Sequence, residues 1–207
     1  DNLDYIAGNK GYKVNCYWTD MIKTKTWQFP GERINSNDNT HYLNQDENIA
    51  WIGYNYTNAQ NPLNSFSANT AQYISSIKAE NWFAYKRDNA WVTPSNFNFE
   101  YGKGYEITFE SSRPFDTYSI VQSAPVAVRT IPDAQLFSYK VLSDYQGIVI
   151  DSIYNVNDIE EIGVYQDTTC VGAAVFEEYP VFIRAYTTDS ETKNRTKNSG
   201  LSFKIIT

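Results

Sequence analysis

Short segments in which apolar and polar residues alternate recur along the chain, and this recurrence constrains the fold more than any other feature. Alternation at a period of two places one face of a strand against a core and the other toward solvent. In the second half, polar turns separate such segments every dozen residues or so, a spacing typical of an antiparallel β-sandwich, immunoglobulin-like or jelly-roll-like. The segments predicted to be strands there are 136–142, 147–153, 161–165, 170–176, 180–186 and 201–206, with a hairpin turn at 167–169.

Composition extends the same expectation to the whole chain. Aromatic residues make up 16% of the sequence, with 17 Tyr, 11 Phe and 5 Trp, whereas there is a single Met. Tyr, Phe, Val, Ile and Thr suit a pleated, half-buried surface better than a helix. We therefore expect a mostly β protein.

The first half predicts a small α+β unit. Residues 49–56 and 104–109 alternate as strands do, and residues 82–86 and 90–92 flank a hairpin turn at 87–89. A short helix is predicted between the first strand and the hairpin, beginning at Asn69 or Thr70 and running through Ala79. The face of that helix would carry Tyr73, Ile74 and Ile77.

Proline spacing suggests where the two parts divide. Pro114, Pro125 and Pro132 follow one another at short intervals, and Pro is excluded from central strands because it lacks an N–H donor. We expect a boundary near residue 125, which gives an aromatic-rich unit over 1–124 and a β-sandwich module over 125–207. A faint internal repeat pairs residues 10–14 with 103–107.

Charge argues against two classes of partner. The net charge is −7, whereas nucleic acids and anionic membrane surfaces attract clustered Lys and Arg. No apolar run approaches the length that spans a bilayer, roughly 20 residues. We expect no nucleic acid partner and no membrane span. The Asn-, Ser-, Thr- and Tyr-rich composition favours a location outside the cell.

Two cysteines, Cys16 and Cys170, leave the redox compartment open. They are compatible with one disulfide or with two buried thiols. Because they lie far apart in the sequence and in different expected units, free thiols are favoured.

Two stretches resemble known modules. Residues 77–85, Trp91 and residues 101–107 resemble a recurrent unit of long secreted bacterial proteins, and residues 158–165 with 170–174 resemble a companion module. Such repeat and sandwich modules occur near the C-termini of large multidomain surface proteins, some attached to polysaccharide-degrading enzymes. The resemblance implies an extracellular or cell-surface location, neighbouring domains of the same polypeptide as partners, and no catalytic residues.

Catalytic constellations are poorly supported. His41 is the single histidine, lies near no nucleophile motif and is expected at the surface. A small jelly-roll glycoside hydrolase would need two carboxylates facing each other across a cleft. Neighbours on a strand point to opposite faces, so adjacent acidic residues cannot form that pair. The candidates are Glu100, Glu106, Glu110, Glu160, Glu161, Glu177 and Glu178, for which solvated outer positions are favoured.

Calcium is the one cofactor that the residues suggest. Asp38, Asp46 and Glu47 lie in an oxygen-rich stretch, and hard cations take several oxygen ligands. There is no Asp-x-Asp-x-Asp-Gly loop, and Asn and Asp also gather in turns for backbone reasons alone. A plain loop is favoured, and otherwise no cofactor is expected.

Aromatic side chains are the remaining candidates for binding. Sugar rings have apolar C–H faces that stack on Trp and Tyr. Trp82, Tyr85 and Trp91 on the predicted hairpin would form such a platform, and Trp18 and Trp27 lie in the same half of the chain. The competing interpretation is that Trp51 and Trp82 belong to the core, since each buries a large apolar area.

Three functions remain after these exclusions. The leading one is a non-catalytic extracellular binding or spacer segment of a larger secreted or surface protein, with a polysaccharide or other surface glycan as the ligand. The second is a structural or adhesion module that assembles through sheet edges. The third is the glycoside hydrolase.

Overall fold

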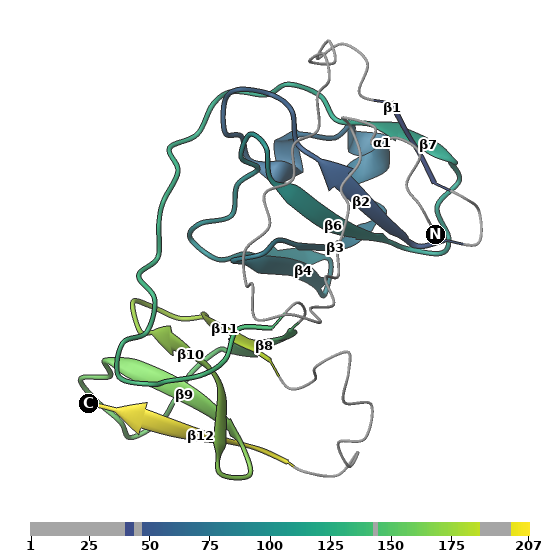
Figure 1. The fold of residues 1–207 in the computed structure, drawn as a ribbon. Coiled ribbons are helices and arrows are strands. Elements are labelled where there is room, and N and C mark those ends of the chain that lie inside the picture. The colour runs from purple at the N-terminus through teal and green to yellow at the C-terminus, as the bar shows by residue number, and fades with distance from the viewer. Residues whose placement is uncertain (1–39, 44–46, 143–144, 187–199) are drawn as a thin grey trace, which may run out of the picture. The chain divides into compact units, whose positions relative to one another are not determined.

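The computed structural model describes residues 40–43, 47–142, 145–186 and 200–207. These residues form mostly antiparallel strands, in agreement with the mostly β prediction. They divide into two compact units, visible in Figure 1. Within the described ranges, the first unit holds residues up to Val92 together with Phe97–Val128, and the second holds Thr93–Asn96 and the residues from Arg129 onward.

A five-stranded antiparallel sheet forms the first unit (Figure 1). Its strand order is β2-β6-β3-β4-β5, so the strand that comes late in the sequence, β6, lies between β2 and β3. The bounds are β2 Ile49–Gly53, β3 Ile74–Lys78, β4 Phe83–Arg87, β5 Ala90–Val92 and β6 Gly104–Phe109. The predicted strands at 49–56 and 104–109 are therefore present, the first of them shorter than expected.

The predicted helix over residues 69–79 is wrong beyond Ala71. Only one turn forms, α1 (Ala68–Ala71), capped by the Ser67 hydroxyl, which accepts the Thr70 N–H at 3.2 Å. The chain then enters β3, where Ile77 pairs with Ala84 on one side and Ile107 on the other. Ile74 and Ile77 fit a helix face by spacing. Both are β-branched, however, and a central strand buries them completely while pairing the backbone on both edges.

The predicted β4–β5 hairpin is confirmed. Arg87 pairs with Ala90, and the two residues between them, Asp88 and Asn89, have φ values of 52° and 62°. A two-residue turn with both central φ values positive matches the twist of the flanking strands. Asp and Asn tolerate that conformation better than most residues, so local chemistry determines this turn.

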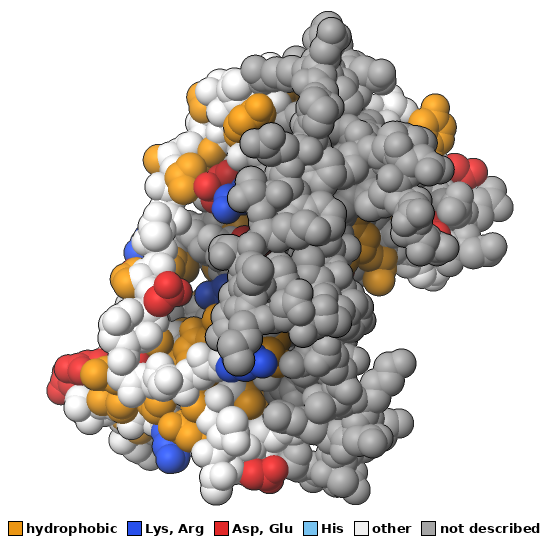
Figure 2. All heavy atoms as spheres, in the orientation of Figure 1, with side chains coloured by type: hydrophobic (Ala, Val, Ile, Leu, Met, Phe, Trp, Pro, Cys, Tyr) orange, Lys and Arg blue, Asp and Glu red, His pale blue; other side chains and the backbone are white. Residues whose placement is uncertain are grey.

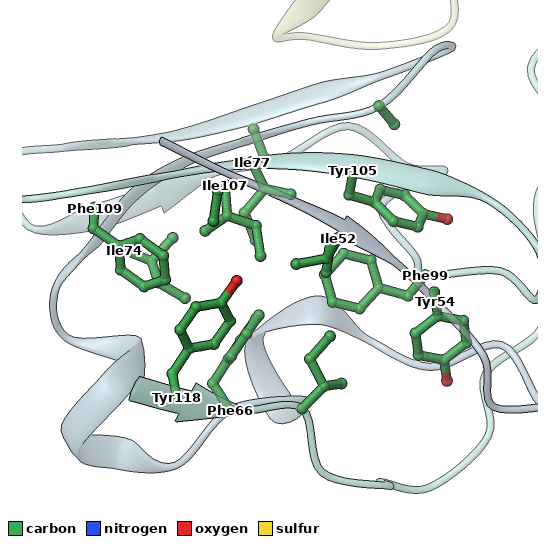
Figure 3. Close-up of a cluster of buried hydrophobic side chains, with 14 of the residues drawn as sticks. Ile52, Tyr54, Phe66, Ile74, Ile77, Phe99, Tyr105, Ile107, Phe109 and Tyr118 are labelled. Atoms are coloured by element: carbon green, nitrogen blue, oxygen red, sulfur yellow. The ribbon is translucent and has the colours of Figure 1, made fainter. Parts of the chain in front are cut away.

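One face of this sheet packs on an aromatic and aliphatic core (Figure 3). Ile52, Ile77 and Ile107 are completely buried, each from a different strand. Phe66 and Tyr118 close the core on the side away from the sheet in Figure 3. Around it lie the 3-10 helix η1 (Pro62–Asn64) and a two-stranded ladder of β1 (Thr40–Tyr42) and β7 (Thr117–Ser119).

Buried tyrosines are characteristic of this core. The Tyr105 hydroxyl accepts the Glu100 N–H at 2.7 Å, and the Tyr54 hydroxyl donates to the Asn58 carbonyl at 2.7 Å. Burial raises the pKa values of Tyr54, Tyr105 and Tyr118, because a phenolate loses its hydration there. The core therefore requires neutral phenols.

The second unit contains a three-stranded and a two-stranded antiparallel sheet. Strand order in the larger sheet is β10-β9-β12, and β11 pairs with β8 in the smaller one. Apolar side chains of both sheets share one core that includes Ile162, Val164, Val171 and Ile183. The bounds are β8 Gln146–Ile150, β9 Glu161–Gln166, β10 Thr169–Val175, β11 Val181–Ala185 and β12 Leu201–Ile206.

A close backbone approach lies beside β10. The position of Gly172 leaves no room for a side chain, since an added Cβ would overlap the Arg184 carbonyl oxygen of β11. The Tyr186 N–H donates to the Val171 carbonyl at 2.7 Å at the same place. A glycine is needed here because two backbones occupy the space that a Cβ would take.

The segment 136–142, predicted as a strand, forms none. Phe137 instead lies over β9, where its ring would be 2.6 Å from a Cβ placed on Gly163. The Glu161 carboxylate accepts the Gln135 N–H at 2.7 Å and the Leu136 N–H at 2.9 Å. The segment thus covers the β9 face that points away from the strand core, with its backbone held by a side chain instead of a neighbouring strand.

The other strands predicted for this half are present as β8 to β12, with bounds that differ by a few residues. The turn after β9 contains Asp167 with φ 55° and joins Gln166 to its partner Thr169.

No helix within the described residues has the length and apolarity needed to cross a membrane.

Candidate functional site

Trp82, one of the predicted platform residues, belongs to the core. Its side chain is 2% exposed. Its ring centroid lies 5.0 Å from that of Phe97 and 5.6 Å from that of Tyr105. The competing interpretation of Trp82 as a core residue is therefore the one that the structure supports, and this ring cannot meet a ligand.

Tyr85 and Trp91 lie on opposite faces of the hairpin. Tyr85 pairs with Val92, whereas Trp91 pairs with the next residue, Lys86. Because successive side chains alternate, Tyr85 is on the face away from the core and Trp91 on the core side. Trp91 packs at the margin of the core against Phe97 at 6.2 Å. The structure therefore does not bring the three predicted rings together.

The Lys86 ammonium holds the Trp91 ring in place. It lies 5.7 Å from the Trp91 ring centroid and donates to the carbonyls of Ala71, at 3.2 Å, and Gln72, at 2.6 Å. A cation held over an indole by two carbonyls orients the ring from one side. This arrangement gives Trp91 a packing partner within the fold.

Other predicted residues fall outside the described part of the chain. Trp18, Trp27, Asp38 and Asp46 lie there, and so does Cys16. Glu47 is described and exposed. No group of three or more His, Cys, Asp or Glu side chains suited to a metal occurs among the residues that the structure describes. Cys170 is a half-buried free cysteine.

Trp51 is an exposed residue, contrary to its interpretation as part of the core. It was expected in the core, but its side chain is 43% exposed. Ala50 and Ile52 are the buried residues of β2, which leaves Trp51 and Ile49 on the opposite face. Period-two alternation alone is compatible with either choice, because all four residues are apolar.

The strand register assembles a two-row surface on the face of the sheet away from the core, here called the outer face. One row runs across four strands as Trp51, Glu106, Lys78 and Phe83. The other row runs across five strands as Ile49, Thr108, Ser76, Tyr85 and Val92. Trp51 and Ile49 are exposed and the rest are partly exposed.

The outer face combines apolar margins with a polar centre. Glu106 and Lys78 occupy neighbouring positions in the middle of the first row, with Trp51 at one end and Phe83 at the other. Four adjacent strands cover three interstrand spacings, about 14 Å. Such a surface offers rings for stacking and side chains for hydrogen bonding, at separations that suit an extended ligand.

His41 was expected at the surface, but it is buried. Its side chain is 6% exposed, and its ring stacks on Tyr118 with centroids 5.1 Å apart and planes at 13°. The β1–β7 ladder places the two residues directly opposite each other. A histidine buried in this way is a packing residue of the first unit.

Among the carboxylate candidates, Glu161 and Glu177 have partners within the fold. Glu161 was expected on a solvated face, but it is 5% exposed and both of its oxygens accept backbone N–H groups. Glu177 forms an ion pair with Arg129 at 3.1 Å. Glu106 lies between the buried Tyr105 and Ile107 and points to the outer face. On the face drawn in Figure 2, acidic and basic side chains of the described residues are scattered and form no single patch.

Comparison with protein-family models, curated protein sequences and solved structures finds no match for this chain. The functional assignment therefore depends on the geometry above. Trp51 and Phe83 are the aromatic residues of the outer face that sequence reasoning missed. For Phe83 the signal was present, because it has the same strand parity as Tyr85.

Proposed function

We propose that this chain is a non-catalytic, extracellular segment of a larger secreted or surface protein, and that the outer face of its first unit binds carbohydrate. The observation that carries the proposal is the row formed by Trp51, Glu106, Lys78 and Phe83. The second unit, with its three-stranded and two-stranded sheets, serves in this proposal as a spacer toward neighbouring domains.

The chemistry of the row supports a glycan ligand. A pyranose ring has an apolar C–H face and a rim of hydroxyl groups, so it needs a stacking surface beside hydrogen-bonding side chains. Trp51 supplies an exposed indole. Glu106, Lys78 and, in the second row, Ser76 and Thr108 supply donors and acceptors.

The net charge favours a glycan over a nucleic acid strand as the extended ligand. A chain with net charge −7 repels nucleic acid strands, which also stack on aromatic rings. In the second unit, Glu161 and Glu177 already have partners, which argues against either of them as half of a hydrolytic pair. On the outer face itself Glu106 is the acidic residue of the row, and we propose that it binds hydroxyl groups without bond cleavage.

Affinity electrophoresis of the full chain through gels containing soluble glucans, mannans, xylans and galactans tests the proposal, with pull-down on insoluble cellulose and chitin. We expect retardation by at least one glycan. Trp51→Ala should weaken it several-fold, because the exposed ring is the main stacking surface. The matched control is Tyr42→Ala, which removes another exposed aromatic of the same unit, 81% exposed and outside the outer face.

Three outcomes would contradict parts of the proposal. Absence of retardation by every glycan leaves only the spacer role. Equal retardation of parent and Trp51→Ala moves the binding surface away from the outer face. Release of reducing sugar from any of these glycans overturns the non-catalytic assignment.

A further inference from the structure

Strand β12 lies at the edge of its sheet. Among the described residues it pairs with β9 alone, from Leu201 opposite Gln166 to Ile206 opposite Glu161 (Figure 1). An edge strand presents a row of N–H and C=O groups that can pair with a further strand. The open edge of β12 therefore has the backbone chemistry to accept another β-strand.

The side chains of β12 continue an apolar face beyond the covered core. Phe203 pairs with Val164, which is completely buried, yet Phe203 itself is 48% exposed. Leu201 and Ile205 have the same strand parity and hence the same face. The core of the second unit thus has an apolar margin at β12 that is only partly covered.

The sequence of β12 is self-complementary in one antiparallel register. When two copies of the strand pair antiparallel, a twofold axis relates them. Side chains directly opposite each other then lie on the same face only if the axis passes at a residue, which is paired with its own copy. Centred on Phe203, the pairing places Phe203 opposite Phe203 and Leu201 opposite Ile205. On the other face it places Ser202 opposite Lys204, so no like charges meet.

The neighbouring registers are worse. A centre at Lys204 puts two ammonium groups directly opposite each other, which destabilises a strand pair. A centre at Ser202 leaves Ile205 without a cross-strand partner. Charge and apolar matching therefore select the register centred on Phe203.

We propose that β12 is a dimerisation strand, which pairs antiparallel with β12 of a second copy of this chain in the register centred on Phe203. The two three-stranded sheets then become one six-stranded sheet. The interface is isologous, because both copies use the same strand. The unpaired N–H and C=O groups along the edge of β12 in each copy then pair with those of the other copy. This proposal is independent of glycan binding, which uses the first unit.

Charge variants at Ser202 test both the pairing and its register. Ser202 is exposed, so substitutions there leave the core intact. Ser202→Glu places a carboxylate opposite Lys204 of the second copy, twice per dimer, whereas Ser202→Lys places an ammonium there. Sedimentation velocity over a dilution series at low salt should show a dissociation constant several-fold smaller for Ser202→Glu and several-fold larger for Ser202→Lys than for the parent.

The order of the two variants is diagnostic because general charge effects predict the reverse. Ser202→Glu adds a negative charge to a chain whose net charge is already −7, which would weaken non-specific association. A parent chain that stays monomeric up to millimolar concentration overturns the proposal. So does a stronger association of Ser202→Lys than of Ser202→Glu.

Cross-linking gives a second measurement. Residues directly opposite each other on antiparallel strands have Cα atoms about 4.5–5.5 Å apart, which a disulfide can bridge. Phe203→Cys should oxidise to a dimer linked through residue 203 in both copies, identified by peptide mapping. The control Ser202→Cys faces Lys204 and should form far less of the symmetric link, and equal yields from the two variants would contradict the register.

Discussion

Gln60 and Val121 are joined by a partly buried hydrogen bond, in which the Gln60 side-chain amide donates to the Val121 carbonyl at 2.7 Å. The same amide donates to the Ser65 hydroxyl at 2.6 Å, and its oxygen accepts the Ser123 N–H at 3.0 Å. Gln60 is 1% exposed. The Gln60 side chain thus adds to the backbone bond from the Val121 N–H to the Ser65 carbonyl in fastening residues 121–123 to the rest of the first unit.

Gln60→Leu should destabilise the first unit by about 1–3 kcal/mol, because the partly buried Val121 carbonyl and Ser123 N–H lose their partner. Urea unfolding followed by tryptophan fluorescence measures the change. Gln122→Leu is the matched control, since Gln122 is exposed in the same segment. Equal stability of the two variants would mean that the Gln60 network contributes nothing net.

Gly172→Ala should destabilise the second unit by about 1–3 kcal/mol, because the new Cβ overlaps the Arg184 carbonyl and forces the backbones apart. Gly200→Ala is the control, since no atom lies within 4 Å of a Cβ placed there. Thermal unfolding followed by circular dichroism should show a lower midpoint for Gly172→Ala alone. An unchanged midpoint would mean that the two strands separate at little cost.

Glu161→Gln should also lower the stability of the second unit, by about 1–3 kcal/mol. The substitution replaces one acceptor oxygen with an NH₂ group that faces a backbone N–H of Gln135 or Leu136. Glu160→Gln makes the same chemical change at an exposed neighbour and should be neutral. Hydrogen exchange at the amides of residues 135 and 136 should accelerate only in Glu161→Gln, and slow exchange there would refute the account.

Alkaline pH should unfold the first unit. The pKa values of Tyr54, Tyr105 and Tyr118 are raised by burial, so the folded state favours the protonated phenols. The resulting stability is fully present below the unfolded pKa, about 10, and is lost as the pH rises toward the folded values. Absorbance of tyrosinate at about 295 nm should rise in two phases as first the exposed and then the buried phenols ionise.

The second of these phases should coincide with the loss of circular dichroism, because the buried phenols ionise only when the core opens. Tyr118→Phe should leave a smaller second phase, and Tyr42→Phe, at an exposed position, a smaller first phase. A single phase with all tyrosines ionising near the ordinary pKa would contradict burial of these rings.

The β4–β5 hairpin and β6 were predictable because their signals are local. Asp88 and Asn89 tolerate positive φ, and the flanking residues alternate as strands do. The segment 136–142 alternates in the same way but forms no strand. Its backbone is anchored at Leu136 by Glu161, a residue more than twenty positions away, and its Phe137 occupies the space above Gly163.

The candidate site was predicted only in part. Tyr85 lies on the outer face, as a platform residue should, whereas Trp82 is in the core and Trp91 packs at its margin. The strand order β2-β6-β3-β4 places Trp51 and Phe83 on the same face of the sheet as Tyr85. A sequence identifies which residues share parity within one strand, but not which of the two faces meets the core.

By itself the sequence determined the class of the fold, mostly antiparallel strands rich in aromatic residues, because alternation and turn chemistry act over a few neighbouring residues. The tertiary structure alone decided whether Ile74–Lys78 is helix or strand and which tryptophans are exposed. Those outcomes depend on pairing with Ile107 and its neighbours in β6, some thirty residues further along, and strand pairing over that separation leaves no mark in local periodicity.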